Sequence, residues 1–321
     1  MTEAFSPAPI PEGVAPVADR VLGFSVGARN VRGRVVRLDA ALNAVLAAHD
    51  YPPPLATVLG EALVLTALLG ATLRDDAGGD AGSAGGGQLT LQAQSKGGPV
   101  DLLVCDYRAG AVRGYLRHDG SDVGALAGRG DAAGGLDLNT LFGEGHLAIT
   151  LDPTAAAERY QGIVPLEGAS LAEAAEGYFA NSEQLPTLIR LAVRWDATTG
   201  WVGGGLLVQH LARSEIGGER LSIADMNPDW QHVLALASTM SDDELTDLSL
   251  SEETLVWRLF HDEEVRVVPG PVPTRGCRCT LAHIKDVLSS FPPDERAEMA
   301  GDDGRIKVDC AFCARVFAVE V

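Results

Sequence analysis

Four of the chain's five cysteines stand in two close pairs near its C-terminal end. Cys277 and Cys279 are separated by one residue, Cys310 and Cys313 by two, and 30 residues lie between the pairs. A thiolate binds zinc at about 2.3 Å, so two short-spaced pairs can supply a tetrahedral shell of four sulfurs. The same sulfurs, once oxidised, are close enough in sequence to form local disulfides. The spacing favours zinc but leaves both forms of chemistry open.

Three uses of such a site differ in what they require around it. A structural zinc site is the commonest, a nucleic-acid-binding ribbon comes next, and a dithiol oxidoreductase is the third. Residues 273–321 carry seven Lys/Arg against eight Asp/Glu, whereas a phosphate-binding surface is normally basic. A dithiol oxidoreductase normally sets its Cys-x-x-Cys in a βαβ unit, but Cys310–Cys313 follows a predicted strand near the chain end. Spacing alone therefore predicts zinc without separating a structural site from a switch.

Composition sets the class of protein that carries these cysteines. With 321 residues, 46% of them hydrophobic, the chain is long enough for one large core and a small accessory domain. Its net charge of -19 argues against binding to nucleic acid or to an anionic membrane, since both need positive charge. The N-terminus lacks a basic start followed by an apolar run, so we expect no signal peptide. Paired cysteines also fit a reducing, cytoplasmic location.

The elements that must position the cysteines begin with a core predicted over residues 21–218, after a tail over residues 1–20. We expect a strand over 24–38, a helix from Asp39 to about Ala48, and a buried helix over 55–73. That last segment is about long enough to span a bilayer, but glycines and Glu61 interrupt it. A glycine-rich loop over 77–87 is predicted at the surface.

The second part of the core changes to a period of two residues, typical of half-buried strands. Ser170 and Glu173 have the spacing of a capping box, which predicts a helix to about Ser182. Strands followed by helices and further strands indicate an α+β fold. The predicted strands, the first four in one antiparallel sheet, cover residues 88–93, 100–107, 112–117, 146–151, 187–196 and 204–211.

Residues 219–272 differ from the core and are predicted to be a linker of short helices. Between Ser241 and Glu264 nine acidic residues stand against one basic residue, Arg258. One helix is expected over 229–240, and a second is expected to begin at Ser249 or Ser251. An ordinary acidic helical hairpin explains this composition. The alternative is a metastable joint whose order depends on what it packs against. Composition alone favours the first.

Several stretches of the chain, taken in order, are similar to one known family. With the two cysteine pairs at the right separation, they resemble the bacterial redox-regulated holdase chaperones of the heat-shock protein 33 family. The resemblance implies an α+β core, a helical linker and a zinc-binding domain over residues 273–321. The stretches are His49–Pro52, Glu158–Gly162, Leu166–Gly168, Tyr178–Phe179, Ser182–Thr187 and Trp257–Glu264.

The resemblance also implies a mechanism. In the reduced, inactive monomer, Cys277, Cys279, Cys310 and Cys313 would bind one Zn²⁺ per chain. Oxidation would form Cys277–Cys279 and Cys310–Cys313 disulfides, release zinc and unfold the linker. The resulting homodimer would hold unfolding client proteins during oxidative stress without using ATP. The candidates for client contact are Leu255, Val256, Trp257, Leu259 and Phe260.

A second class of function is a non-chaperone binding protein whose four-cysteine zinc module is permanent. Zinc release coupled to oxidation separates the two classes, because a scaffold site should keep its metal. An enzyme is the weakest option, since no nucleophile–base or carboxylate constellation stands out and the histidines are scattered. Cys105, in a predicted strand among apolar neighbours, is expected to be a buried and inert thiol.

Overall fold

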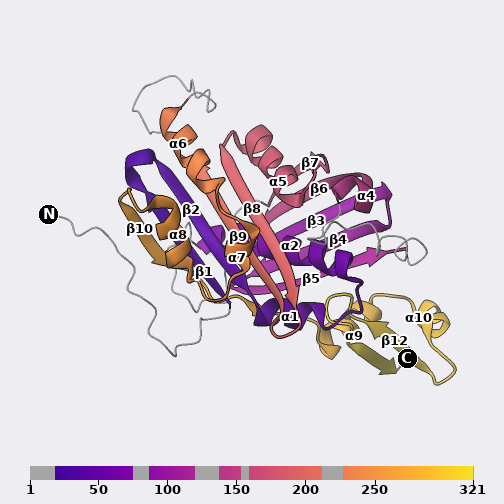
Figure 1. The fold of residues 1–321 in the computed structure, drawn as a ribbon. Helices are drawn as coiled ribbons and strands as arrows, with labels where there is room; N and C mark the ends of the chain where they lie inside the picture. Colours follow the sequence, from indigo (N-terminus) through magenta and orange to yellow (C-terminus); the bar gives the residue numbers. More distant parts are fainter. Residues whose placement is uncertain (1–18, 75–86, 120–136, 153–158, 212–226, 321) are drawn as a thin grey trace.

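The computed structural model describes residues 19–74, 87–119, 137–152, 159–211 and 227–320, and two antiparallel sheets dominate it (Figure 1). The first sheet has the order β10-β1-β2-β9-β8 and the second the order β11-β5-β4-β3-β6-β7; only the short β11 runs parallel to its neighbour. The first sheet consists of β1 (Arg20–Val26), β2 (Val31–Leu38), β8 (Thr187–Asp196), β9 (Gly200–His210) and β10 (Val265–Pro269). The second consists of β3 (Gln88–Gly97), β4 (Val100–Arg108), β5 (Ala111–His118), β6 (Gly143–Asp152), β7 (Tyr160–Pro165) and β11 (Thr274–Arg275).

Helix α2 (Pro53–Gly70) packs against strands of both sheets and forms the centre of the largest apolar core. Within the described ranges, Pro53–Leu73 is the one helix long and apolar enough to cross a membrane, and 89% of its most apolar window is buried inside the protein. The segment is therefore a core helix, as predicted. Three shorter helices complete the core: α1 (Ala40–Leu46), α4 (Leu138–Phe142) and α5 (Leu171–Tyr178). The predicted α+β class is confirmed.

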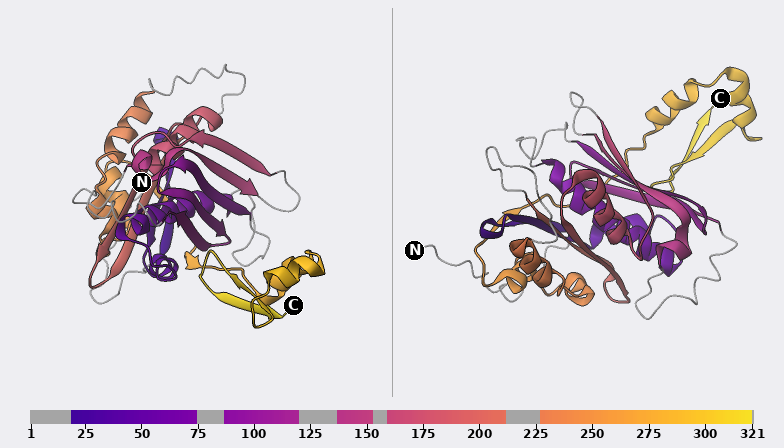
Figure 2. Two further views of the ribbon diagram at one scale, coloured as in Figure 1. Left: turned by 90° about the vertical axis from the view of Figure 1, so that its right-hand side faces the viewer. Right: turned by 90° about the horizontal axis from the view of Figure 1, so that it is seen from above.

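Three helices cover the outer face of the first sheet: α6 (Pro228–Ala237), α7 (Asp242–Thr246) and α8 (Glu252–Phe260) (Figures 1 and 2). Ser251 begins α8, because its hydroxyl accepts a hydrogen bond from the Thr254 N–H at 3.2 Å. The expectation that the linker, residues 219–272, consists of short helices was wrong near its end. Residues 265–269 form β10, which extends the first sheet beside β1, and β-branched valines favour that pairing.

Three predictions in the core need correction. Residues 24–38 are not one strand, since the 3₁₀ turn Gly27–Arg29 separates β1 from β2. Asp39 does not cap α1 with its side chain; the Asp19 carboxylate accepts the N–H of Asp39 at 2.8 Å and of Ala41 at 3.0 Å. Only half of the capping box forms, because the Glu173 carboxylate accepts from the Ala169 N–H.

The described residues set limits on the predicted boundaries. Asp19 is buried and Arg20 begins β1, although both fell in the predicted tail of residues 1–20. The remainder of that tail, nearly all of the glycine-rich loop at 77–87 and the predicted core boundary at 218 lie outside the described residues.

The cysteines belong to a small C-terminal module that stands out from the core (Figure 2) and begins just after β11, the neighbour of β5. The strands β12 (Arg305–Asp309) and β13 (Val316–Glu320) form an antiparallel pair, and helix α9 (Leu281–Ser289) packs against β13. Helix α10 (Pro293–Met299) lies between α9 and β12 in sequence. Its apolar centre is small, with four buried residues: Ile284, Leu288, Ile306 and Val319. A core of this size is insufficient to fold a module alone, so further cross-links are expected.

Candidate metal centre

The four predicted cysteines come together at one end of the C-terminal module. Their sulfurs all lie within 4.8 Å of one another. Cys277 is 3.2 Å from Cys279 and 3.6 Å from Cys310, and Cys279 is 3.4 Å from Cys313. A tetrahedron of sulfurs around zinc has edges of about 3.8 Å, given bonds of about 2.3 Å. All five cysteines are free thiols. The four clustered sulfurs therefore have the geometry and the donor type that suit a tetrahedral metal ion with a preference for sulfur.

Two backbone turns place the pairs. Cys277 and Cys279 follow β11, whose two residues are fixed to β5 by parallel pairing. The second pair occupies the turn of the β12–β13 hairpin. There the Cys310 N–H donates to the Arg315 carbonyl at 3.0 Å, and the Ala314 N–H donates back to Cys310 at 2.8 Å. Ala314 adopts a left-handed conformation (φ 52°), which lets the chain reverse sharply after the last sulfur.

Burial and hydrogen bonding give Cys277, Cys279 and Cys310 different pKa values. Burial disfavours the thiolate of Cys277, but hydrogen bonds from the Cys279 N–H and the neighbouring thiols outweigh it and lower the pKa of Cys277 to about 7. Burial and donation to the same neighbours raise the pKa of Cys279, and burial also raises the pKa of Cys310. Four thiolates so close repel one another, so complete ionisation at neutral pH requires a cation.

The residues enclosed by the two cysteine pairs attach the module to the core. The Arg278 guanidinium, between Cys277 and Cys279, donates to Gln88 at 2.8 Å and to the buried Asp106 carboxylate at 3.1 Å. Phe312, between Cys310 and Cys313, lies under the Arg113 guanidinium, 3.8 Å from the ring centre. Its ring also meets Tyr115 edge-on, with 4.9 Å between ring centres. Any rearrangement of the sulfurs therefore moves a contact with β3, β4 or β5.

The linker candidates are mostly buried in this structure. Helix α8 presses one face into the second apolar cluster of the core, where the Phe24 and Phe260 rings lie 5.6 Å apart. Trp257 is the exception, with 41% of its surface exposed. The buried candidates are Leu255, Val256, Leu259 and Phe260. None of these four is accessible to another protein while α8 stays packed on the sheet.

Buried Arg37 on β2 fastens the linker to the core. Its guanidinium donates to the Leu245 carbonyl at 3.3 Å and to the Leu250 carbonyl, and it lies 3.9 Å from the Glu252 carboxylate. Burial lowers the pKa of Arg37, and the Glu252 charge opposes that shift. Because the Glu252 carboxylate is 3.9 Å away and the other two groups are uncharged carbonyls, the guanidinium depends on the linker backbone for its hydrogen bonds.

Two half-buried arginines add to this attachment at the edges of the linker. Arg20 hydrogen-bonds to the Glu253 carboxylate at 2.9 Å, and Arg29 pairs with Asp229 and with Glu263 at 2.8 Å each. Core arginines therefore compensate part of the linker's negative charge, and the sequence analysis did not identify these arginines.

The linker helices contact the first sheet, while the cysteine module contacts the edge of the second (Figures 1 and 2). The segment that carries β10 and β11, residues 265–275, connects the linker helices to the cysteine module. Cys105 is fully buried, and burial raises the pKa of its thiol, as expected of an inert residue.

The fold and site define a class of protein: an α+β core with an acidic helical linker and a four-thiol, metal-competent module. The model of the Hsp33 protein family matches residues 19–320, so the chain belongs to the Hsp33 family. It is 42% identical over 307 residues to the 33 kDa chaperonin of Caulobacter vibrioides (strain NA1000 / CB15N), covering 94% of this chain and 95% of that protein. Identity to the 33 kDa chaperonin of Cronobacter sakazakii is 36%, with 88% and 86% covered.

A solved structure supports the same fold. The crystal structure of the 33 kDa chaperonin of Thermotoga maritima, a heat shock protein 33 homologue, superimposes with a TM-score of 0.71. The match covers 94% of each chain at 20% sequence identity, so it bears on the fold alone. The suspected family is thus confirmed by the sequence comparisons, and the fold by the structural one.

Proposed function

We propose that this protein is a redox-regulated, ATP-independent holdase of the cytoplasm, without enzymatic activity. Reduced protein would hold one Zn²⁺ on Cys277, Cys279, Cys310 and Cys313 and remain an inactive monomer. The observation that supports the proposal is that four thiols lie together while Arg278 and Phe312, enclosed by the two cysteine pairs, contact the core. A change in the positions of the sulfurs would therefore displace these contacts at the core surface.

The chemistry begins at a thiolate. Bound zinc would keep the sulfurs ionised, and the lowered pKa of Cys277, about 7, favours its thiolate even without the metal. A thiolate attacks one oxygen of a peroxide, giving a sulfenic acid and releasing hydroxide. A neighbouring thiolate then attacks that sulfur, forming the disulfide and expelling a second hydroxide. The peroxide takes up the two electrons that the two thiolates lose.

Pairing within each motif, Cys277 with Cys279 and Cys310 with Cys313, follows the family pattern. The sulfur distances also permit the cross-pairs Cys277–Cys310 and Cys279–Cys313. Pairing within motifs draws Arg278 and Phe312 into tight loops and removes all cross-links between the two halves of the module. Mass spectrometry of peptides from the oxidised protein separates these pairings.

The next step is release of the linker. Loss of the metal removes the chief stabiliser of the module, and structural zinc supplies roughly 10–16 kcal/mol in small peptides. With β11 no longer fixed to β5, β10 and then α8 would detach from the first sheet. The faces of Leu255, Val256, Leu259 and Phe260, with Trp257 beside them, would then contact unfolding clients in a homodimer.

The test compares reduced, zinc-loaded protein with peroxide-treated protein in an aggregation assay of a thermally unfolding client. We expect protection only after oxidation, and equal protection by both forms would contradict the proposal. The alternative, a non-chaperone binding protein with a permanent zinc module, predicts that neither form protects and that peroxide leaves the metal bound.

A further inference from the structure

One buried carboxylate of the core is shared by the contacts of both cysteine pairs. Asp106 of β4 is only 5% exposed. Its Oδ1 accepts a hydrogen bond from the Thr90 hydroxyl at 2.7 Å. Its Oδ2 accepts from the Arg113 guanidinium at 2.8 and 2.6 Å and from the Arg278 guanidinium at 3.1 Å. Two guanidinium groups therefore share a single carboxylate oxygen.

These two guanidinium groups lead to different cysteine pairs. Arg278 lies within the first pair, so Asp106 holds that pair directly. Arg113 belongs to β5 of the core, and its guanidinium lies 3.8 Å from the ring centre of Phe312, which lies within the second pair. Asp106 thus holds the second pair indirectly, because it fixes the position of the Arg113 guanidinium on the ring.

The charges in these contacts are unequal. One carboxylate, Asp106, faces two guanidinium groups. Burial lowers the pKa of Arg278, as does the charge of Arg113, whereas the charge of Asp106 opposes that shift. The excess positive charge lies beside the Phe312 ring, whose face attracts cations. Withdrawal of Arg278 would leave a neutral Asp106–Arg113 pair and so weaken the attraction between Arg113 and the ring.

We propose that Asp106 is a positioning residue that couples the two cysteine pairs. Displacement of either pair weakens the hold of the core on the other, because both contacts depend on the same carboxylate oxygen. The coupling is a property of the reduced protein, and its use in switching rests on the proposed redox function. In that setting, a disulfide in one pair would loosen the other pair from the core.

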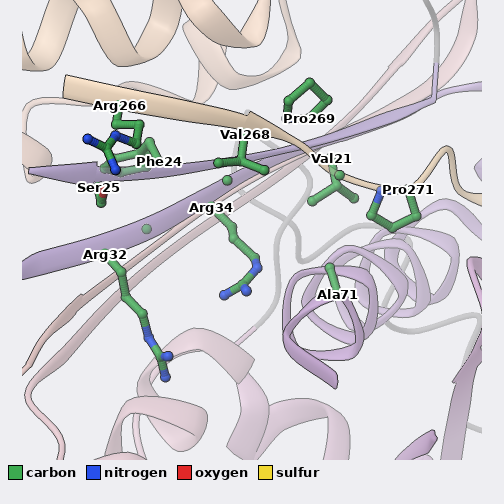
Figure 3. A pocket seen from close by; sticks show the side chains of 13 residues that line it. Val21, Phe24, Ser25, Arg32, Arg34, Ala71, Arg266, Val268, Pro269 and Pro271 are labelled. Atoms are coloured by element: carbon green, nitrogen blue, oxygen red, sulfur yellow. The ribbon is translucent and has the colours of Figure 1, made fainter. Parts of the chain in front are cut away.

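The segment between the module and the linker packs loosely, so it offers little resistance to such a displacement. Val268, Pro269 and Pro271 line an open groove of about 360 Å³ on the first sheet, as Figure 3 shows. Val268 and Val272 are each 58% exposed. Because little buried surface holds this segment, detachment of the module would extend along it towards β10.

Two amides report directly on whether the module is attached to the core. The Thr274 N–H donates to the Gly110 carbonyl at 3.0 Å, and the Gly276 N–H donates to the Val112 carbonyl at 2.8 Å. Both amides exchange with solvent when β11 leaves β5, so their hydrogen exchange measures the detached fraction. The measurement uses reduced, zinc-loaded, full-length protein without oxidant or client. Its failure is therefore distinguishable from failure of the holdase assay.

Asp106→Asn keeps the size of the side chain but removes its charge. We expect the two amides to exchange about tenfold faster or more, because charge-assisted hydrogen bonds to the module are lost. The matched control is Asp101→Asn on the same strand, where Asp101 accepts from Arg117 of β5 at 2.8 Å in an exposed pair. The control should stay within about twofold of the unmodified protein.

A double variant separates a positioning role from a general role in stability. Arg278→Gln alone should accelerate the exchange, but added to Asp106→Asn it should change the rate by less than about twofold, since its partner charge is already absent. A carboxylate that only stabilises the sheet would leave the full effect of Arg278→Gln in place. That result, or unchanged exchange in Asp106→Asn, would overturn the proposal.

A second pair of substitutions leaves the buried carboxylate intact and serves if urea unfolding shows that Asp106→Asn is not folded. Phe312→Ala should accelerate exchange of the two amides several-fold in the unmodified protein. In the Arg278→Gln background the acceleration should be smaller, because the excess positive charge beside the ring is gone. Equal acceleration in both backgrounds would show that the two cysteine pairs are held independently, against the proposal.

Discussion

Replacing Arg37 by methionine is the sharpest test of how the linker is held. The side chain is only 1% exposed, and its guanidinium serves the carbonyls of Leu245 and Leu250 and faces Glu252. Methionine retains the apolar stem but removes every donor. It leaves two linker carbonyls without a partner and Glu252, itself 3% exposed, with Arg20 at 3.5 Å as its remaining cation.

The expected cost follows from the burial of these groups. Removing one partner of a buried, hydrogen-bonded charge costs about 3–5 kcal/mol. That amount shifts the equilibrium between docked and released linker by roughly two to nearly four orders of magnitude. We therefore expect reduced, zinc-loaded Arg37→Met to release α7 and α8 and to protect a client without any oxidant.

Hydrogen exchange resolves the effect along the chain. Amides of residues 242–260 should lose protection in Arg37→Met, while those of β4 and β5 should keep it. Arg117→Met, which breaks an exposed pair with Asp101 worth about 0–1 kcal/mol, is the matched control. Adding Glu252→Gln to Arg37→Met should restore part of the protection, since it removes the buried uncompensated charge. Unchanged exchange over residues 242–260 in the folded variant would refute this reasoning.

Three further predictions concern other contacts. Phe312→Ala should keep its zinc but expose β5 and β11 to hydrogen exchange, because it removes the Arg113 and Tyr115 contacts, worth about 1–3 kcal/mol; zinc loss equal to that of a cysteine variant would contradict the docking role. Gly204→Ala should loosen α7, because its Cβ would lie 2.1 Å from the Leu245 carbonyl oxygen; an unchanged exchange pattern would contradict it. Burial and the nearby Asp242 charge raise the pKa of Glu61 to about 7, so the folded state binds more protons and the free energy of unfolding falls between about pH 4.5 and 7. Glu61→Gln should flatten that fall and stabilise the protein by about 1–3 kcal/mol above pH 7, a range that is discounted for the partial exposure of Glu61. Urea unfolding at several pH values measures the effect, and the same pH dependence of the free energy of unfolding in both proteins would exclude this cause.

Local patterns in the sequence predicted what depends on local contacts. The spacing of Cys277–Cys279 and Cys310–Cys313 identified the thiol cluster, and Ser251, one of the two predicted start positions, begins α8. Apolar composition located α2 as a core helix. In each case the deciding interactions lie within a few residues or within one motif.

The features that the sequence did not predict depend on contacts between residues far apart in the chain. Strand β10 forms because β1, over 230 residues earlier, offers an edge, and nothing in residues 265–269 specifies that partner. Arg37 meets the linker about 208 residues away, and Arg278 reaches Gln88 across 190. The position of Arg278 and Phe312 inside the two cysteine motifs was the one available signal. Their contacts with the core still required the fold.

The measurement closest to the central claim follows zinc, thiols and client protection in one peroxide-treated sample. A chromogenic chelator reports released zinc, thiol titration counts the remaining cysteines, and aliquots enter the aggregation assay. We predict that one zinc ion per chain is released as the four module thiols disappear, that Cys105 stays reduced, and that protection rises with the same time course. Reductant with added zinc should reverse all three. Protection that develops while zinc stays bound, or zinc release without protection, would contradict the account.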